Sequence, residues 1–209
     1  MSIPSHSVFI VTDVQNDFCA GGALAVPDGD AVIPVIHRVA PLFEHIILTQ
    51  DWHSLQHMSF ARAHPGKRPF EDIEAGYGTQ TLWPDHCVQG TRGAEFHPDL
   101  HLPQAELILR KGFHPEIDSY SAFFENDHKT ATGLCGYLRE RGIRRVFLVG
   151  LAYDYCVGYS ALDARTHGFD SVVIKDACRA IGLKDSVERM EREFERAGVQ
   201  VTASANLAG

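Results

Sequence analysis

The chain has 209 residues, a length that suits one domain with a full-sized hydrophobic core. Its composition, 44% hydrophobic and 22% charged, lies close to the globular average and excludes the disordered and fibrous classes. The formal net charge of -8 and the pI near 5.8 make nucleic acid and anionic membranes unfavourable partners, because a polyanion is repelled on average.

The cysteines and the N-terminus indicate the compartment. Five cysteines without a CxxC pair argue against a disulfide framework and for a reducing cytosol. The apolar run from Val8 to Val11 is too short for a signal sequence, and no stretch has the length of a transmembrane helix. We therefore expect a cytoplasmic protein of one domain, residues 1–209, and leave open whether it is a monomer or a homo-oligomer.

Short apolar runs alternate with helical patterns along most of the chain. The runs predict strands at 8–12, 46–49, 107–109, 145–150, 171–175 and 199–202. Apolar residues at helical spacing predict helices at 30–43, 132–141, 157–165 and 186–197. In the last helix, Asp185 and Glu188 fit a capping box and Gly198 suits the position after the helix. This order predicts a single-domain, three-layer α/β/α fold with a mostly parallel sheet.

Four reactive side chains follow predicted strands. Asp13 follows the first strand, Asp51 the second, Lys111 the third and Cys156 the fourth. Ligands of open parallel sheets bind beyond the carboxyl ends of the strands. We therefore expect these four side chains at one rim of the sheet.

Cys156 lies between a predicted strand and a predicted helix. The positive end of the helix dipole should lower its pKa and favour the thiolate, and nearby N–H groups could hold an oxyanion. Asp13 could take the thiol proton, while Lys111 would fix the electrostatics. Each residue has a plain alternative: a small buried hydrophobe for Cys156, a turn residue for Asp13 and a strand-end charge for Lys111.

A segment at 51–104 lacks sustained periodicity yet holds six of the 12 histidines. Long irregular segments in compact domains are usually functional. Asp51 and His53, two residues apart, can reach one ion, with a third ligand from His57 or His86. Such donors suit Zn²⁺, Fe²⁺ or Mn²⁺. The remaining histidines of the segment are taken as ordinary loop residues: His64, His97 and His101.

Six short motifs now match a known family. They stand at 13–18, 21–24, 51–53, 83–88, 111–112 and 154–157. Together they resemble the nicotinamidase/pyrazinamidase branch of the isochorismatase-like hydrolases, in the same order from about Val8 to Asp176. The resemblance implies that family's fold. It also implies hydrolysis of the small molecules nicotinamide and pyrazinamide, through a cysteine thioester, in NAD salvage.

The resemblance also assigns roles to residues. It implies one divalent metal, Zn²⁺ in preference to Fe²⁺ or Mn²⁺, bound to the ring nitrogen of the substrate, and a cis peptide between Leu151 and Ala152. The implied catalytic residues are Asp13, Lys111 and Cys156, the oxyanion donors Ala152 and Cys156, the metal ligands Asp51, His53 and His86, and the substrate-pocket residues Phe18, Leu24, Trp83, Tyr120 and Tyr155.

Two positions depart from the family pattern. Tyr153 stands where a smaller threonine is usual, which leaves the detail of the turn open. His57 does not have the spacing of a fourth histidine ligand, so we interpret it as structural or as a support for the metal ligands.

Three other functions compete with this interpretation. A sister hydrolase of carbamoyl or ureido amides would keep the cysteine triad but would not need Asp51, His53 and His86. A non-catalytic metal-binding or thiol redox module would turn over no amide, and the missing CxxC argues against the redox version. An isochorismatase proper would lack the cysteine nucleophile.

Overall fold

A computed structural model describes residues 3–207 of the chain, so the ends of the predicted domain, residues 1–2 and 208–209, lie outside it. Its centre is a six-stranded sheet in the order β5-β2-β1-β6-β7-β8, with every neighbouring pair parallel. The strands are β1 (Ser7–Thr12), β2 (His45–Asp51), β5 (Leu107–Lys111), β6 (Arg145–Leu151), β7 (Asp170–Arg179) and β8 (Gln200–Thr202).

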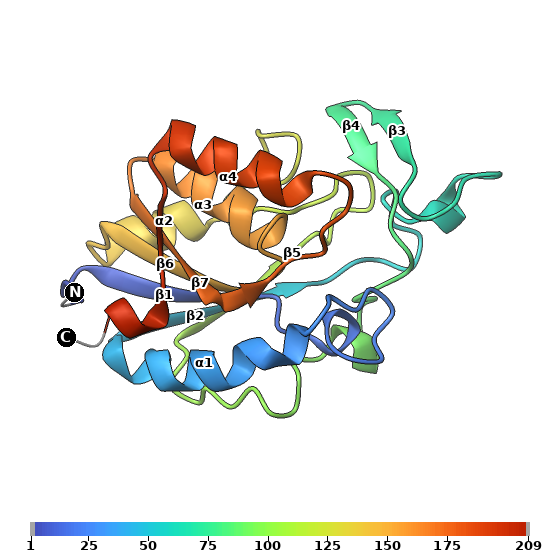
Figure 1. Cartoon of the computed structure of the whole chain (residues 1–209). Helices are drawn as coiled ribbons and strands as arrows, with labels where there is room; N and C mark the ends of the chain where they lie inside the picture. Colours follow the sequence, from blue (N-terminus) through green and yellow to red (C-terminus); the bar gives the residue numbers. More distant parts are fainter. Residues whose placement is uncertain (1–2, 208–209) are drawn as a thin grey trace.

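Helices cover both faces of this sheet (Figure 1). One face carries α1 (Val32–Val39), and the opposite face carries α2 (Leu134–Glu140), α3 (Cys156–Thr166) and α4 (Ser186–Ala197). The predicted three-layer α/β/α fold with a parallel sheet is confirmed.

The strands are apolar on both sides because each side faces a helical layer. In β1, Phe9 and Val11 belong to the core on the α1 side, whereas Val8 and Ile10 belong to the core beneath α2, α3 and α4. All four side chains are almost completely buried. Continuous Val- and Ile-rich runs are the pattern expected of such doubly covered parallel strands.

The irregular segment between β2 and β5 contains a hairpin that the sequence did not predict. Its antiparallel strands, β3 (Asp72–Ala75) and β4 (Gly78–Thr81), stand apart from the main sheet beyond the carboxyl ends of its strands (Figure 1). These strands are short and mostly polar, so they leave no apolar run to detect.

One local prediction holds only in part, and another is wrong. The helix predicted at 30–43 is α-helical only over Val32–Val39 and continues as a tight turn, Ala40–Leu42, where Pro41 has no N–H to donate. Asp185 precedes α4 but makes no side-chain capping bond. Its carboxylate lies instead 3.7 Å from the Arg189 guanidinium, so the capping box is not formed. Gly198 does end α4 in the left-handed region, at φ 72°.

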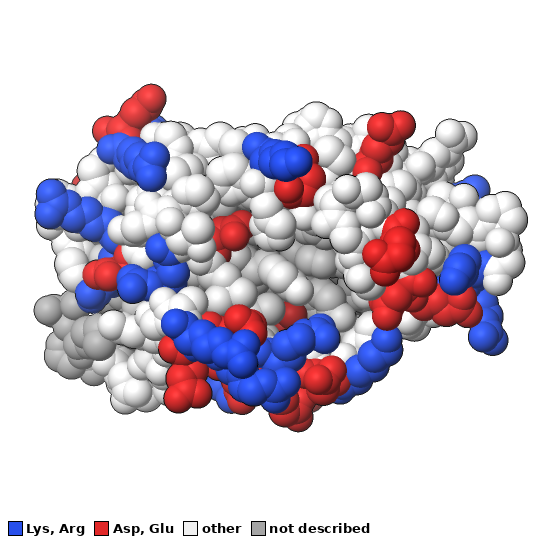
Figure 2. All heavy atoms as spheres, turned by 90° about the horizontal axis from the view of Figure 1, so that it is seen from above, with Lys and Arg blue, Asp and Glu red and all other residues white. Residues whose placement is uncertain are grey.

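The surface has charges of both signs. Figure 2 shows lysine and arginine side chains interspersed with aspartate and glutamate side chains over the face that it displays. Within residues 3–207, no helix is both long and apolar enough to cross a bilayer. All five cysteines are free, as expected.

Candidate active site

The four rim residues predicted from the sequence meet at the carboxyl end of the sheet. Asp13 directly follows β1, Asp51 and Lys111 end the neighbouring strands β2 and β5, and Cys156 begins α3. The Lys111 ammonium lies 2.9 Å from Asp13 Oδ2 and 3.4 Å from Cys156 Sγ. The parallel topology therefore assembles an acid, an ammonium and a thiol from residues far apart in the chain.

Lys111 is fully buried and lies at the centre of this group. It forms ion pairs with both Asp13 and Asp51, and it donates a hydrogen bond to the Ser119 carbonyl at 2.9 Å. Burial acts to lower its pKa, but the two carboxylates outweigh this and raise the pKa of Lys111 well above its usual value. Lys111 therefore stays charged.

The protonation state of Cys156 differs from the prediction. Burial raises the pKa of the Cys156 thiol well above its usual value; Asp13 and Asp51 raise it further, and the Lys111 ammonium offsets only part of this. The predicted lowering of this pKa by the helix N-terminus is thus wrong for these side chains by themselves. The resting group is a thiol, and its proton must leave as the sulfur reacts.

Asp13 is placed to receive that proton. One ligand-type atom each of Asp13, Asp51 and Cys156 lies within 4.8 Å of the others. The Thr49 hydroxyl donates to Asp13 Oδ1 at 2.6 Å and fixes the carboxylate. Burial raises the pKa of Asp13, which makes it a stronger base than an exposed aspartate.

The turn between β6 and α3 connects Ala152 and Cys156, the two predicted oxyanion donors. The Leu151–Ala152 peptide is cis, as expected. Cys156 begins α3, so its N–H is among the first helical donors, which have no partner inside the helix. Ala152 and Cys156 line the same cavity. An oxyanion formed beside Sγ could therefore be held by these donors.

Tyr153 does not disturb this turn. Its ring points into the helical layer and packs edge-on against Phe194 of α4, with 5.6 Å between ring centroids. The Asp154 carboxylate anchors the turn by accepting the N–H groups of Ile181 at 2.9 Å and Gly182 at 2.8 Å. The larger side chain at position 153 is thus accommodated away from the cavity.

Asp51, His53 and His86 form a buried cluster of metal-ligand type, with one donor atom of each within 4.8 Å of the others. The Nε2 atoms of His53 and His86 lie 3.5 and 3.8 Å from Asp51 Oδ2. Each imidazole is oriented by its other nitrogen, which donates at 2.8 Å to the carbonyl of Gly112 or Pro84. Both Nε2 atoms thereby face the carboxylate, an arrangement typical of metal-binding histidines.

Two further features fit a divalent metal. Burial and the neighbouring His53 lower the pKa of His86 to about 4, so at neutral pH it is the uncharged imidazole that binds metals. Gly112 has φ +67°, and a Cβ there would approach His53 Cε1 to 2.5 Å. A glycine is needed at this position for His53 to keep its orientation.

His57 packs behind His53 rather than facing Asp51. The two imidazole centroids are 4.4 Å apart. Nδ1 of His57 is 2.8 Å from the Ser59 hydroxyl, and Nε2 is 3.2 Å from the Ile117 carbonyl. Both ring nitrogens are therefore engaged within the protein.

A small cavity of about 20 Å³ joins the thiol to the histidine cluster. Trp83 donates a hydrogen bond to the Tyr120 hydroxyl at 3.2 Å, and its ring lies edge-on to Tyr155. All the predicted pocket residues line the cavity: Phe18, Leu24, Trp83, Tyr120 and Tyr155. Two further lining residues, Asp118 and Ile181, were not predicted from the sequence.

Comparison with known proteins assigns this architecture to a family. Residues 7–206 match the model of the isochorismatase domain. The chain belongs to the isochorismatase family.

Three relatives of the chain within the isochorismatase family are particularly informative. A nicotinamidase of Acinetobacter baylyi is 52% identical over 207 residues, which cover 99% of this chain and 97% of the relative. The solved structure of an Acinetobacter baumanii nicotinamidase/pyrazinamidase is 56% identical, with a TM-score of 0.96 over 97% of this chain and 98% of that one. A Pyrococcus horikoshii pyrazinamidase solved in complex with zinc is 36% identical, with a TM-score of 0.77 over 96% and 99% of the two chains.

Gln15 is a positioning residue of this isochorismatase-family site to which sequence analysis assigned no role. Its amide oxygen accepts the N–H of Asp51 at 2.8 Å, and its amide nitrogen donates to the Asp51 carbonyl at 2.8 Å and to the Ala94 carbonyl at 2.9 Å. The amide thereby holds the end of β2. Its place two residues after Asp13, inside a recognised motif, was the available signal.

Glu125 is a buried carboxyl near Lys111 that has no part in the predicted chemistry. It is 1% exposed, and within residues 3–207 its Oε2 has no hydrogen-bond partner. Burial raises the pKa of Glu125 to about 7, partly offset by Lys111. The folded state therefore prefers the protonated form of this side chain.

Ionisation of Glu125 should destabilise this isochorismatase-family fold. Because its folded pKa lies above its ordinary value of 4.5, its contribution is fully present below that value and is lost as pH rises through about 7. Relative to Glu125→Gln, the parent should lose up to about 3 kcal/mol of unfolding free energy between about pH 4.5 and about pH 8.5. Urea unfolding at both pH values measures the difference. If the unfolding free energies of the parent and Glu125→Gln changed in parallel with pH, this prediction would be contradicted.

Proposed function

We propose that the chain is a nicotinamidase, a cysteine-dependent amidohydrolase that converts nicotinamide to nicotinate and ammonia, accepts pyrazinamide and serves NAD salvage. The observation that carries this proposal is a single cavity lined by both the Cys156 thiol and the cluster of Asp51, His53 and His86. The full-length similarity to a nicotinamidase and to a nicotinamidase/pyrazinamidase structure supports it.

The first half of the reaction forms a thioester. Asp13 accepts the proton of Cys156, and the thiolate attacks the carboxamide carbon while the Lys111 ammonium, 3.4 Å from Sγ, stabilises the negative charge. The N–H groups of Ala152 and Cys156 hold the oxyanion, and one such donor typically contributes about 2.7–4 kcal/mol. The carbon–nitrogen bond then breaks as protonated Asp13 gives its proton to the leaving ammonia.

The second half releases the acid. Asp13, again a carboxylate, takes a proton from water as the water oxygen attacks the thioester carbon. The carbon–sulfur bond breaks, and the Cys156 sulfur regains its proton. The products are the carboxylic acid and the resting thiol, so one base at one position serves both half-reactions.

Asp51, His53 and His86 would hold one divalent metal, for which we propose Zn²⁺ with Fe²⁺ and Mn²⁺ as alternatives. The mixed carboxylate and imidazole donors suit these ions, and a related pyrazinamidase was solved in complex with zinc. When bound, the ion supplies a coordination position for the ring nitrogen of a pyridine carboxamide. Phe18, whose ring centroid is 5.4 Å from that of His86, would then pack beside the substrate ring.

Replacing His53 with alanine should remove one equivalent of metal per chain. The variant loses one of only three protein ligands, the usual minimum for an open catalytic-type site. Elemental analysis of zinc-loaded, desalted protein measures the content. His101→Ala, on an exposed loop, is the matched control and should keep the content of the parent. Unchanged metal content in both His53→Ala and His86→Ala would rule out the assignment.

The competing function is hydrolysis of a carbamoyl or ureido amide by the same triad. That reaction has no pyridine nitrogen to orient, so the buried donor cluster beside the thiol favours nicotinamidase. An ammonia-release assay with nicotinamide and an N-carbamoyl amino acid separates the two. We expect turnover of nicotinamide; release from the carbamoyl compound alone would overturn the proposal.

A further inference from the structure

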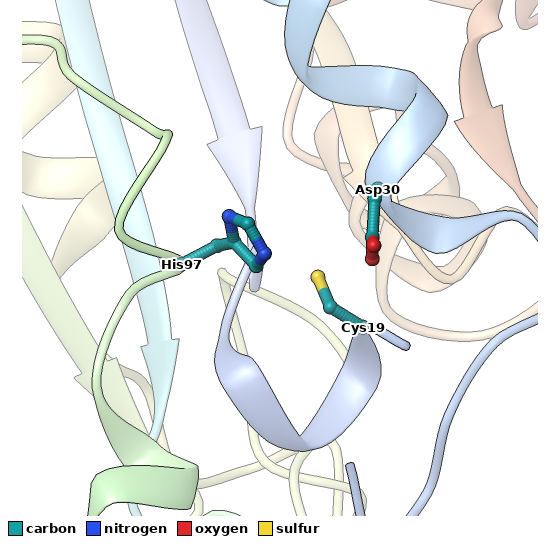
Figure 3. Close-up of side chains that lie close together, drawn as sticks. All are labelled: Cys19, Asp30 and His97. Carbon is teal, nitrogen blue, oxygen red and sulfur yellow. The ribbon is translucent and has the colours of Figure 1, made fainter. Parts of the chain in front are cut away.

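A second group of metal-type donors lies outside the active-site cavity. Cys19, Asp30 and His97 come from three separate segments, and one donor atom of each lies within 4.8 Å of the others. Figure 3 shows the Cys19 sulfur between the carboxylate of Asp30 and the imidazole of His97. None of the three lines the active-site cavity, so this cluster is distinct from that site.

The backbone already holds the three segments in place. The N–H of His97 donates to the Val14 carbonyl at 3.0 Å, which pins the His97 loop to the segment before Cys19. Asp30 Oδ1 accepts the N–H of Ala20 at 2.9 Å, a contact that holds the Asp30 carboxylate beside the segment of Cys19 (Figure 3). Nδ1 of His97 is 3.2 Å from the N–H of Asp99, so Nε2 is the nitrogen available to the cluster. Separate hydrogen bonds therefore hold the His97 loop and the Asp30 carboxylate near Cys19.

Solvent reaches the cluster from one side. A cleft of about 340 Å³ is lined by Cys19 and His97 together with residues of the loops at 16–22 and 92–98. Cys19 itself is 1% exposed and packs against the core on its other side. An ion could enter through the cleft and keep a water molecule as its fourth ligand.

We propose that Cys19, Asp30 and His97 bind a second Zn²⁺, separate from the metal cluster of Asp51. One thiolate sulfur, one imidazole nitrogen and one carboxylate oxygen are the donors that zinc takes in proteins, and with water they complete four-coordination. On binding, the sulfur–zinc bond forms, the S–H bond breaks and the thiol proton passes to solvent.

The other functions of a buried cysteine fit less well. Burial and the Asp30 carboxylate raise the pKa of the Cys19 thiol to about 12, so it is not a second nucleophile. No other cysteine belongs to the cluster, so a disulfide switch has no partner there. The zinc would tie the segment that carries Phe18 to the short helical turn just before α1 and to the loop at 95–100. We therefore infer a structural ion that stabilises the folded chain by mass action.

Zinc stoichiometry tests the proposal. Chelator-treated protein is titrated with Zn²⁺ and its content measured after desalting. The parent should bind about two equivalents, Cys19→Ser and His97→Ala about one each, and the double variant Cys19→Ser/His53→Ala essentially none. Cys135→Ser, from the half-buried cysteine of α2, is the matched control and should bind as the parent does. Parent-like content in Cys19→Ser or, should that variant fail to fold, in His97→Ala would overturn the proposal.

Cobalt adds a test that does not depend on activity. In a Cys156→Ala background, which removes the active-site thiol, Co²⁺ should give a thiolate-to-metal charge-transfer band from Cys19. The band should be absent in Cys19→Ser/Cys156→Ala and present in Cys135→Ser/Cys156→Ala. Zinc should also raise the melting temperature of His53→Ala but not that of His53→Ala/His97→Ala. Absence of the cobalt band, or an equal zinc-induced rise in the melting temperatures of His53→Ala and His53→Ala/His97→Ala, would contradict the second site. A failure of the proposed amidase activity would leave these readings unaffected.

Discussion

Cys156→Ala is expected to lower kcat for nicotinamide by at least about 10³-fold, because no other group can form the thioester. The Cys156 sulfur lies 3.4 Å from the Lys111 ammonium, and Cys156 lines the same cavity as Ala152. The variant removes only a sulfur from a small side chain, so folding and metal content should be retained. Ammonia release under saturating substrate measures the loss.

The other cysteines supply the controls for this experiment. Cys135→Ala changes a half-buried residue of α2 outside the cavity and should keep near-parent activity. Cys178→Ala, a buried position on β7, controls for lost packing and should also turn over. If Cys156→Ala keeps even a tenth of the parent rate, the thioester mechanism is wrong.

Nicotinamide should be hydrolysed with a kcat/KM about 10⁴–10⁵-fold higher than that for benzamide. The two amides have almost the same shape, but benzamide lacks the ring nitrogen that the ion held by Asp51, His53 and His86 would take. A site built around a polar contact rejects an analogue without it by about 10⁴–10⁵-fold, whereas shape alone gives about 10–200-fold. Steady-state kinetics on the zinc-loaded protein measures this ratio.

Two comparisons sharpen this test of selectivity. Pyrazinamide keeps a suitably placed ring nitrogen and should be accepted. Removing the metal with a chelator should shrink the ratio mainly by slowing nicotinamide. Equal rates on nicotinamide and benzamide in the loaded protein would exclude the orienting role of the ion and return attention to the carbamoyl amidase alternative.

The fold and the rim of the site could be predicted because both depend on local pattern and topology. Buried parallel strands are continuous apolar runs, and their carboxyl ends meet at one edge, so Asp13, Asp51 and Lys111 converge whatever the detail of the loops. The β3–β4 hairpin was missed because its short polar strands carry no such run. Its position depends on contacts between loops, which local pattern does not encode.

The pKa of Cys156 and the contacts between residues far apart in the chain could not be predicted from the sequence. The helix N-terminus predicts a lowered pKa for Cys156, but the raised pKa results from complete burial beside Asp13 and Asp51, a sum of three-dimensional distances. Ile181 reaches the cavity from the loop after β7. His97 lies 78 positions from Cys19 in the chain, so the sequence pattern predicts only an ordinary loop residue there. No spacing rule connects the two.

The Lys111 ammonium forms ion pairs with two carboxylates at once. One belongs to Asp13, beside the Cys156 thiol, and the other to Asp51, in the histidine cluster. A dication bound through Asp51 would therefore favour loss of a proton from Cys156, since it adds positive charge to a shared buried network. By thermodynamic reciprocity, ionising the thiol would tighten cation binding by the same factor. Metal affinity and the acidity of the Cys156 thiol are thus linked by one coupling free energy.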